Sequence, residues 1–448
     1  MAIKYNSDIL FLILEELQDD PKTLFSCLMI NKLWCEIAVH ILWKNPWQYN
    51  ITYSNKNSLF NIICFYLPQD IKILLPSHLL FSYQQLSFNY LSFCNCINIE
   101  IIKKIISMIK PSLQRKICSF LIRQCTNLKY LNMISIDHQM LSFYLPETKA
   151  LLESLCELTC DTSTNPSYFC GLAYNCQNIQ RLIIINKTHN VNDGVVELIK
   201  VQKILRYFKW TDDFKTEHNI TNDPYTKIIL ALEKKSDMIN HLILYFQLLY
   251  HEEHMLFRIL PKFHKLKTLI LNKYCSKNET LLPIYYNLEI LHIDYINMNA
   301  VINIITNSGG YIKEILPNYN SYYDDDYHYE NYTKDTLLLI SSIYENCPII
   351  EVLMLVFPSS LEHFVEFEIL LRNCQNLKKL NLIIDDNCGN YEQGAENIKE
   401  LLRILNRSAP TGLKNIKIFN DSIPYLKSSE ILEKSSNIYL GELTDFYC

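Results

Sequence analysis

The residues best suited to chemistry in this chain do not complete a catalytic or metal-binding pattern. The segment His251-Glu252-Glu253-His254 places its two histidines three positions apart. A zincin motif needs the histidines at i and i+4 with a glutamate beside the first, because only that spacing turns both imidazoles toward one metal ion. No third ligand is signalled nearby, so we interpret this segment as a solvated helix face.

The cysteines and glycines also argue against an enzyme. Cys94 and Cys96, like Cys156 and Cys160, lack the paired C-x-x-C spacing of a zinc site. The chain has 8 glycines, and no glycine-rich phosphate loop or Gly-x-Ser-x-Gly nucleophile elbow is present. The sequence therefore predicts a non-catalytic protein without a metal or cofactor.

Charge and hydropathy narrow the partners. The 448 residues include 42 Lys and Arg against 47 Asp and Glu, and the pI is about 6.2. Nucleic-acid binders usually carry a basic patch and a high pI, so we expect no nucleic acid. No apolar run approaches membrane-spanning length and the start does not resemble a signal peptide. We expect no membrane partner, reduced thiols, and a cytoplasmic or nuclear location.

The first 47 residues predict three short helices. Ser7 or Asp8 can cap the first helix, and Asp20 followed by Pro21 is a start signal for the second. Positions 9 to 14 are all apolar, so the first helix is apolar nearly all round and must be buried on more than one side. About 40 residues cannot cover so much apolar surface alone. Either the rest of the chain or a second protein must cover it.

This segment resembles the F-box motif. The matching residues are Asp8-Ile9-Leu10, Ile13-Leu14, Leu17, Leu24, Leu28, Trp34 and Trp43, while Tyr5-Asn6 stands where the family has Leu-Pro. The resemblance implies that the helices pack against an Skp-type adaptor, which in turn joins a cullin scaffold. The implied adaptor-binding residues are Ile9, Leu10, Leu14, Leu17, Leu24, Leu28 and Trp34. Some of these must instead form the module's own core, and the sequence does not separate the two sets.

The remaining chain contains a leucine-rich-repeat-like pattern of apolar, two variable, apolar, one variable, apolar. Its units start at 88, 128, 179, 239, 266, 288, 312, 350, 377 and 413. Several starts are 22 to 27 residues apart, within the range of leucine-rich repeats. Amphipathic segments at 98–110, 335–346 and 396–407 predict helices between the strands. Cys125, Cys176, Cys347 and Cys374 each precede a unit by three residues, which favours small buried thiols.

We therefore predict an α/β fold: a three-helix F-box-like module at 1–47, a connector at 48–85 with a helix over 59–66, and an irregular leucine-rich-repeat-like α/β solenoid at 86–448. One loop interrupts the repeats. Tyr323, Asp324, Asp325 and Asp326 belong to a segment rich in tyrosine and acidic residues, and tyrosine is favoured in binding surfaces. They are weak candidate contacts for a target protein, because a disordered or solvated insertion is the more usual interpretation of such a pattern.

The family resemblance implies a substrate-recognition subunit of an SCF-type E3 ubiquitin ligase. In that function the N-terminal module binds the adaptor, the solenoid binds an unknown protein substrate, and the substrate is ubiquitinated for proteasomal degradation. The alternative is a leucine-rich-repeat interaction scaffold without a ubiquitin role, in which the N-terminal helices only cap the repeats.

Overall fold

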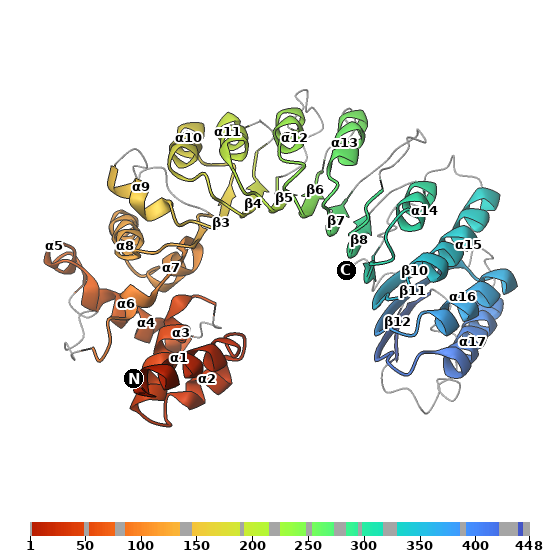
Figure 1. The fold of residues 1–448 in the computed structure, drawn as a ribbon, viewed down its shortest axis with the longest axis horizontal. Helices are drawn as coiled ribbons and strands as arrows, with labels where there is room; N and C mark the ends of the chain where they lie inside the picture. The colour runs from red at the N-terminus through yellow and green to blue at the C-terminus, as the bar shows by residue number, and fades with distance from the viewer. Residues whose placement is uncertain are drawn as a thin grey trace. The chain divides into compact units, whose positions relative to one another are not determined.

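The structure, a computed structural model, describes the chain except residues 1, 49–52, 77–85, 135–145, 189–191, 215–224, 248–252, 273–283, 294–297, 317–328, 386–390, 421–437 and 442–448. The chain forms two compact units, residues 1–205 with 213–215 and residues 206–212 with 216–448. In each unit parallel strands alternate with helices, and the helices lie on one side of the strands (Figure 1).

The first unit begins with helices and continues with a parallel sheet in chain order. Its helices are α1 (Ala2–Glu15), α2 (Pro21–Cys27), α3 (Lys32–Lys44), α4 (Tyr53–Tyr66), α5 (Gln69–Lys72), α6 (Tyr90–Phe93), α7 (Ile99–Ile105), α8 (Pro111–Gln124), α9 (Pro146–Leu152), α10 (Pro166–Asn175) and α11 (Asp193–Val201). Its strands are β1 (Cys96–Asn98), β2 (Tyr130–Asn132), β3 (Glu157–Asp161) and β4 (Arg181–Asn186), paired in parallel from each strand to the next.

The second unit has the same plan. Its strands are β5 (Tyr207–Asp212), β6 (His241–Tyr245), β7 (Thr268–Leu271), β8 (Ile290–Ile293), β9 (Glu314–Ile315), β10 (Val352–Pro358), β11 (Lys379–Asp385), β12 (Asn415–Phe419) and β13 (Ile438–Gly441). Each pairs in parallel with the next. Its helices are α12 (Thr226–Glu233), α13 (Glu253–Ile259), α14 (Met298–Thr306), α15 (Tyr329–Asn346), α16 (Leu361–Asn373) and α17 (Tyr391–Ser408), with a 3-10 turn at Leu260–Lys262.

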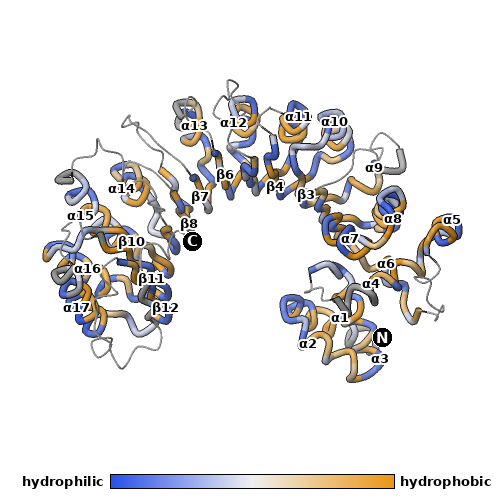
Figure 2. The backbone as a smooth tube through the Cα atoms, turned by 180° about the vertical axis from the view of Figure 1, so that it is seen from behind, coloured by the Kyte–Doolittle hydropathy of each residue, from blue (hydrophilic) through white to orange (hydrophobic). Residues whose placement is uncertain are grey.

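The repeat core lies between strands and helices. In β4, Leu182 and Ile184 are fully buried and alternate with half-exposed neighbours, as the pleat of a strand requires. The repeat helices alternate between hydrophobic and hydrophilic stretches (Figure 2), so each turns one face toward the strands. Neighbouring helices pack closely. A Cβ on Gly194 of α11 would lie 2.1 Å from the Pro166 carbonyl oxygen of α10, so only glycine fits there.

The sequence pattern located most of the strands. Every predicted unit from 128 onward contains one, namely β2, β4 and β6 to β12. The cysteines that precede four of these units are almost fully buried. Each closes the end of a helix, as at Cys374, whose amide donates to the Leu370 carbonyl oxygen at 2.8 Å. The predicted helices at 335–346 and 396–407 lie within α15 and α17, and the one at 59–66 lies within α4.

The prediction of a strand at 88–93 is wrong. Tyr90–Phe93 forms the helix α6, and the first strand is Cys96–Asn98, which pairs in register with Tyr130–Asn132. A short helical turn buries Leu91 as well as a strand would, so the apolar spacing did not distinguish a helix from a strand at this position. The pattern also missed β3 and β5, where Cys160 and Trp210 stand in place of an aliphatic residue. The helix predicted over 98–110 is shorter, because α7 ends at Ile105.

Candidate functional site: the N-terminal helical module

The N-terminal module consists of α1 to α3, and local sequence signals start two of these helices, α2 and α3. The Asp20 side chain caps α2 by accepting from the Thr23 amide at 3.2 Å, and Pro21 occupies the first helical position. The Thr23 hydrogen bonds favour the carboxylate and lower the pKa of Asp20 below its ordinary value. Asn31 caps α3 by accepting from the Trp34 amide at 3.0 Å. Helices α2 and α3 therefore begin where unpaired backbone amides find side-chain acceptors. The cap predicted at Ser7 or Asp8 for the first helix is wrong, because α1 begins at Ala2 and both residues lie inside it.

The module has its own hydrophobic core. All three helices contribute to it, and α3 lies against both α1 and α2. Leu14 and Leu24 are 0% exposed and lie at the centre. The buried members are Leu10, Leu14, Leu24, Cys27, Ala38, Ile41 and Leu42, with Phe11, Leu17, Leu28, Leu33, Trp34, Ile37 and Trp43 packed around them.

The structure divides the predicted adaptor-binding residues into three groups. Leu10, Leu14 and Leu24 are buried in the module's core, so their assignment as contact residues is corrected: their surfaces are already occupied within this chain. Leu17, Leu28 and Trp34 are half-buried at the edge of the same core. Ile9 alone among the seven is well exposed, at 57%.

Several apolar side chains, of which the sequence singled out only Ile9, are exposed on α1, on α2 and in the turn after α2. Ile9, Leu12 and Ile13 have i, i+3, i+4 spacing, so they share one face of α1. Met29 is 87% exposed. We call the full set the outer apolar surface: Ile9, Leu12, Ile13, Phe25, Met29 and Ile30. The run of apolar residues at 9–14 signalled this excess, but only the packed helix shows which side chains face outward.

The module is anchored to the first repeat through α3 and the turn behind it. The buried indole of Trp47 donates through Nε1 to the Cys96 carbonyl oxygen in β1 at 2.6 Å. The amide of Asn95 donates to the Lys44 carbonyl oxygen at 3.1 Å. The Trp43 ring lies 4.6 Å from the Tyr90 ring, centroid to centroid. The inner side of the module is therefore continuous with the repeats of the first unit, while α1 and α2 present its outer side.

Charged groups in the module support its geometry. The Lys44 ammonium contacts the Glu15 carboxylate at 2.5 Å and lies 4.6 Å from the centre of the Phe11 ring, which ties the end of α3 to α1. His40 lies between the Phe11 and Phe93 rings, with centroid distances of 5.8 and 4.8 Å. Partial burial and then the nearby Lys44 charge lower the pKa of His40 below its ordinary value. The His40 imidazole therefore packs as an aromatic ring between Phe11 and Phe93.

Most of the other sequence candidates fall in segments that the structure does not describe. Tyr323, Asp324, Asp325 and Asp326 lie outside the described residues, as do His251 and Glu252. Within the described ranges, no group of three or more His, Cys, Asp or Glu side chains could hold a metal ion. No described helix is both long and apolar enough to cross a membrane.

Comparison with known proteins adds a likeness in fold. No protein-family model matches this chain, and no curated protein sequence matches it. A solved structure that matches is the Rad7 and Elc1 complex in yeast. The identity is 14%, the match covers 76% of this chain and 91% of the other, and the TM-score is 0.41. At these values the likeness carries no argument about function or partner.

Proposed function

We propose that this chain is a substrate-recognition subunit of an SCF-type E3 ubiquitin ligase. In this proposal the N-terminal module binds an Skp-type adaptor and, through it, a cullin scaffold. The repeats bind a target protein, which is then ubiquitinated and degraded by the proteasome, in the cytoplasm or the nucleus. One observation carries the proposal: the outer apolar surface lies on a module whose own core is already complete.

The outer apolar surface is costly to leave in water. Full burial of a Leu, Ile, Met or Phe side chain contributes about 1.5–3 kcal/mol, and this surface has six such residues that are more than half exposed. Soluble proteins tolerate scattered apolar residues, but an i, i+3, i+4 stripe on one helix is typical of helix-mediated docking. The six residues, with half-buried Leu17, Leu28 and Trp34 at the edge, are therefore the contacts that we propose for the adaptor.

The proposed role needs no catalytic residue in this chain. A substrate receptor accelerates ubiquitin transfer by holding target lysines near the charged ubiquitin carrier, which raises their effective concentration. The parts this role requires are a docking surface and a rigid recognition surface. The outer apolar surface and the repeat array supply them.

A second function is an interaction scaffold in which α1 to α3 only cap the repeats. The anchoring of the module favours it, because Trp47 and Lys44 join the module to β1 as a terminal cap would be joined. A cap needs a polar outer face to keep the array soluble, and α1 presents Ile9, Leu12 and Ile13 instead. That contrast leads us to prefer the docking function.

The test is co-expression of the full chain with an Skp-type adaptor, followed by co-purification. Ile9→Asp/Ile13→Asp puts two charges on the outer apolar surface without touching the core. Each interface residue of this kind is worth about 2 kcal/mol, so we expect the complex to weaken by about 100-fold or more. Leu10→Asp/Leu14→Asp would not serve, because both side chains are buried and the module would unfold.

The matched control is Leu361→Asp/Val365→Asp on α16, an exposed apolar pair with i, i+4 spacing on a repeat helix. We expect this variant to bind the adaptor as the wild type does. If the wild-type chain is soluble and folded yet forms no complex, the docking function is wrong and the scaffold function stands. Equal binding by both double variants would instead remove the outer apolar surface as the contact.

A further inference from the structure

The residues that precede successive strands in the second unit form a row of charges. These residues are joined through their backbones, because the amide of each donates a hydrogen bond to the carbonyl oxygen of the row member on the preceding strand. The Glu289 amide donates to the Lys267 carbonyl oxygen at 2.8 Å, for example, and the Lys414 amide donates to the Lys378 carbonyl oxygen at 3.0 Å. The row is Lys267, Glu289, Lys313, Glu351, Lys378 and Lys414. Neighbouring positions in such a row are about 4.8 Å apart, the spacing of hydrogen-bonded strands.

The first five charges of the row alternate in sign, and each lysine among them pairs with a glutamate. Glu289 accepts from Lys267 at 3.0 Å and from Lys313 at 2.9 Å. These two contacts lower the pKa of Glu289, and Glu289 raises the pKa of Lys313. Glu351 accepts from Lys378 at 2.7 Å. Each of these lysines therefore has a carboxylate beside it in the row.

The sixth position breaks the alternation. Lys414 follows Lys378, where a glutamate would continue the pattern, and no described residue forms an ion pair with Lys414. The adjoining Lys379 is also exposed and has no ion pair among the described residues, and it lies in register with Asn415. Lys417, two residues after Asn415 on β12, is exposed as well. This end of the row has an excess of positive charge that its own carboxylates do not balance.

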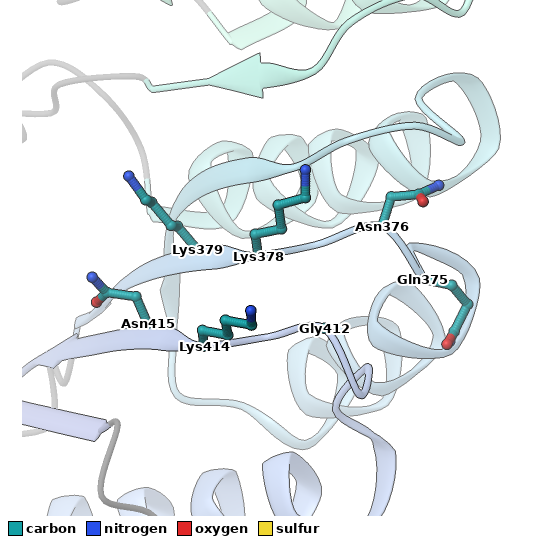
Figure 3. A pocket seen from close by; sticks show the side chains of 7 residues that line it. All are labelled: Gln375, Asn376, Lys378, Lys379, Gly412, Lys414 and Asn415. Carbon is teal, nitrogen blue, oxygen red and sulfur yellow. The ribbon is translucent and has the colours of Figure 1, made fainter. Parts of the chain in front are cut away.

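A groove lies at this end of the row. Its volume is about 620 Å³, within the range of pockets that hold ligands. Figure 3 shows Lys378 and Lys379 at the start of β11 beside Lys414 and Asn415 at the start of β12. The lining residues are Gln375, Asn376, Lys378, Lys379, Gly412, Lys414 and Asn415. Among them are three ammonium groups and three amides, and no carboxylate.

We propose that this groove binds an acidic segment of a partner protein, with carboxylate side chains opposite Lys379 and Lys414. The ligand would supply the carboxylate that the row lacks beside Lys414, at the distances of about 2.7–3.0 Å that Glu289 and Glu351 show. Glu289 and Glu351 already pair with lysines of the row in this way, so a carboxylate is the group that the row itself places beside lysine. Lysine also binds phosphate as a point charge, so a phosphoserine probe must decide between the two anions.

The binding of an acidic segment does not depend on the N-terminal module. That the segment belongs to the ubiquitination target rests on the proposed function. The test therefore uses the full chain without an adaptor, so that loss of adaptor binding and loss of groove binding are separate results.

The probe is a short fluorescent peptide with consecutive Glu residues, and binding is measured by fluorescence anisotropy at low and high salt. Lys379→Ala/Lys414→Ala removes the two charges that have no ion pair with any residue in the described ranges. We expect the double variant to bind about tenfold or more weakly, which corresponds to about 1.4 kcal/mol. Wild-type affinity should fall as salt rises, because the contacts are exposed ion pairs. The matched control is Lys267→Ala/Lys313→Ala, which also removes two lysines, both from row positions already paired with Glu289, and it should bind as the wild type does.

Three further probes decide between ligands. A peptide with Gln in place of Glu should not bind, and equal binding would overturn the proposal. Binding of a phosphoserine peptide in the absence of any binding to the Glu peptide would also overturn it, in favour of a phosphate site. A single-stranded oligonucleotide that binds more tightly than the peptide, with the same dependence on Lys379 and Lys414, would assign the groove to nucleic acid instead. Unchanged Glu-peptide binding by the double variant would remove the groove as the site.

Discussion

The exposed faces of helices α17 and α1 differ in chemistry, one being charged and the other apolar. On α17, charged side chains neutralise one another: Arg403 pairs with Glu396 and Glu400, and Arg407 pairs with Glu400 and with Glu368 of α16. On α1, Ile9, Leu12 and Ile13 are exposed with no comparable network. The charged surface on α17 is well solvated as it stands. Covering the apolar surface on α1 would lower the free energy, because it removes apolar area from water. The outer face of α17 is thus covered by paired charges, while α1 exposes apolar side chains.

The largest expected effect separates the module's core from its outer surface. Leu24→Ala removes a fully buried side chain and should lower the free energy of unfolding of the module by about 2–5 kcal/mol. Met29→Ala, at 87% exposure, should change it by less than about 0.5 kcal/mol. Hydrogen exchange of the α1–α3 amides measures both. Equal losses in the two variants would mean that Met29 is part of the core.

An intermediate effect concerns the polar interior of the repeats. His363 is fully buried, with Nε2 2.7 Å from Thr336 Oγ1 and Nδ1 2.7 Å from Ser360 Oγ. Both hydroxyls can accept as well as donate, so either protonation state of the imidazole can keep these contacts, and the cost of the charged form comes from its burial. Burial lowers the pKa of His363 from 6.5 to about 4.

This shift sets the sign of a pH dependence. Between about pH 6.5 and 4 the unfolded chain binds the proton and the folded chain does not, so stability is full above pH 6.5 and falls as the pH drops. At pH 5 the loss should be about 2 kcal/mol, located in α15 and α16. His363→Gln does not titrate, and its stability should change less with pH than that of the wild type. Parallel pH profiles of the two proteins would show that His363 does not contribute.

The smallest expected effect tests the charged surface. Arg403→Ala removes ion pairs whose members are largely exposed, so it should destabilise the chain by less than about 0.5 kcal/mol. The difference from the wild type should shrink further at high salt, since salt screens exposed charges. Thermal denaturation at two salt concentrations measures it. A larger, salt-independent loss would indicate that the Arg403 aliphatic stem packs against the core.

The sequence by itself determined the repeats and the positions of most strands. Residues such as Leu353 and Leu380 occupy the same position in the apolar pattern of their repeats. A strand buries alternate side chains against its helices, so this pattern can be recognised within a few neighbouring residues. It also determined the helix start at Asp20, whose side chain caps its own backbone, but not the start of the first helix, since Ser7 and Asp8 lie inside α1. It failed at Tyr90–Phe93, where helix and strand bury the same residues, and at β3 and β5, where Cys160 and Trp210 depart from the aliphatic pattern.

Only the tertiary structure decided which apolar residues of the first helix are core and which are surface. Positions 9 to 14 are apolar without interruption, so their pattern does not show which side of the helix faces the core. The packing of α1 against α3 buries Leu10 and Leu14 and leaves Ile9 and Ile13 exposed. The charged row was equally hidden from the sequence. Lys378 and Lys414 are far apart along the chain, and hydrogen bonding between strands β11 and β12 brings them together. Local spacing fixes the elements, but the surfaces that contact partners depend on which elements become neighbours.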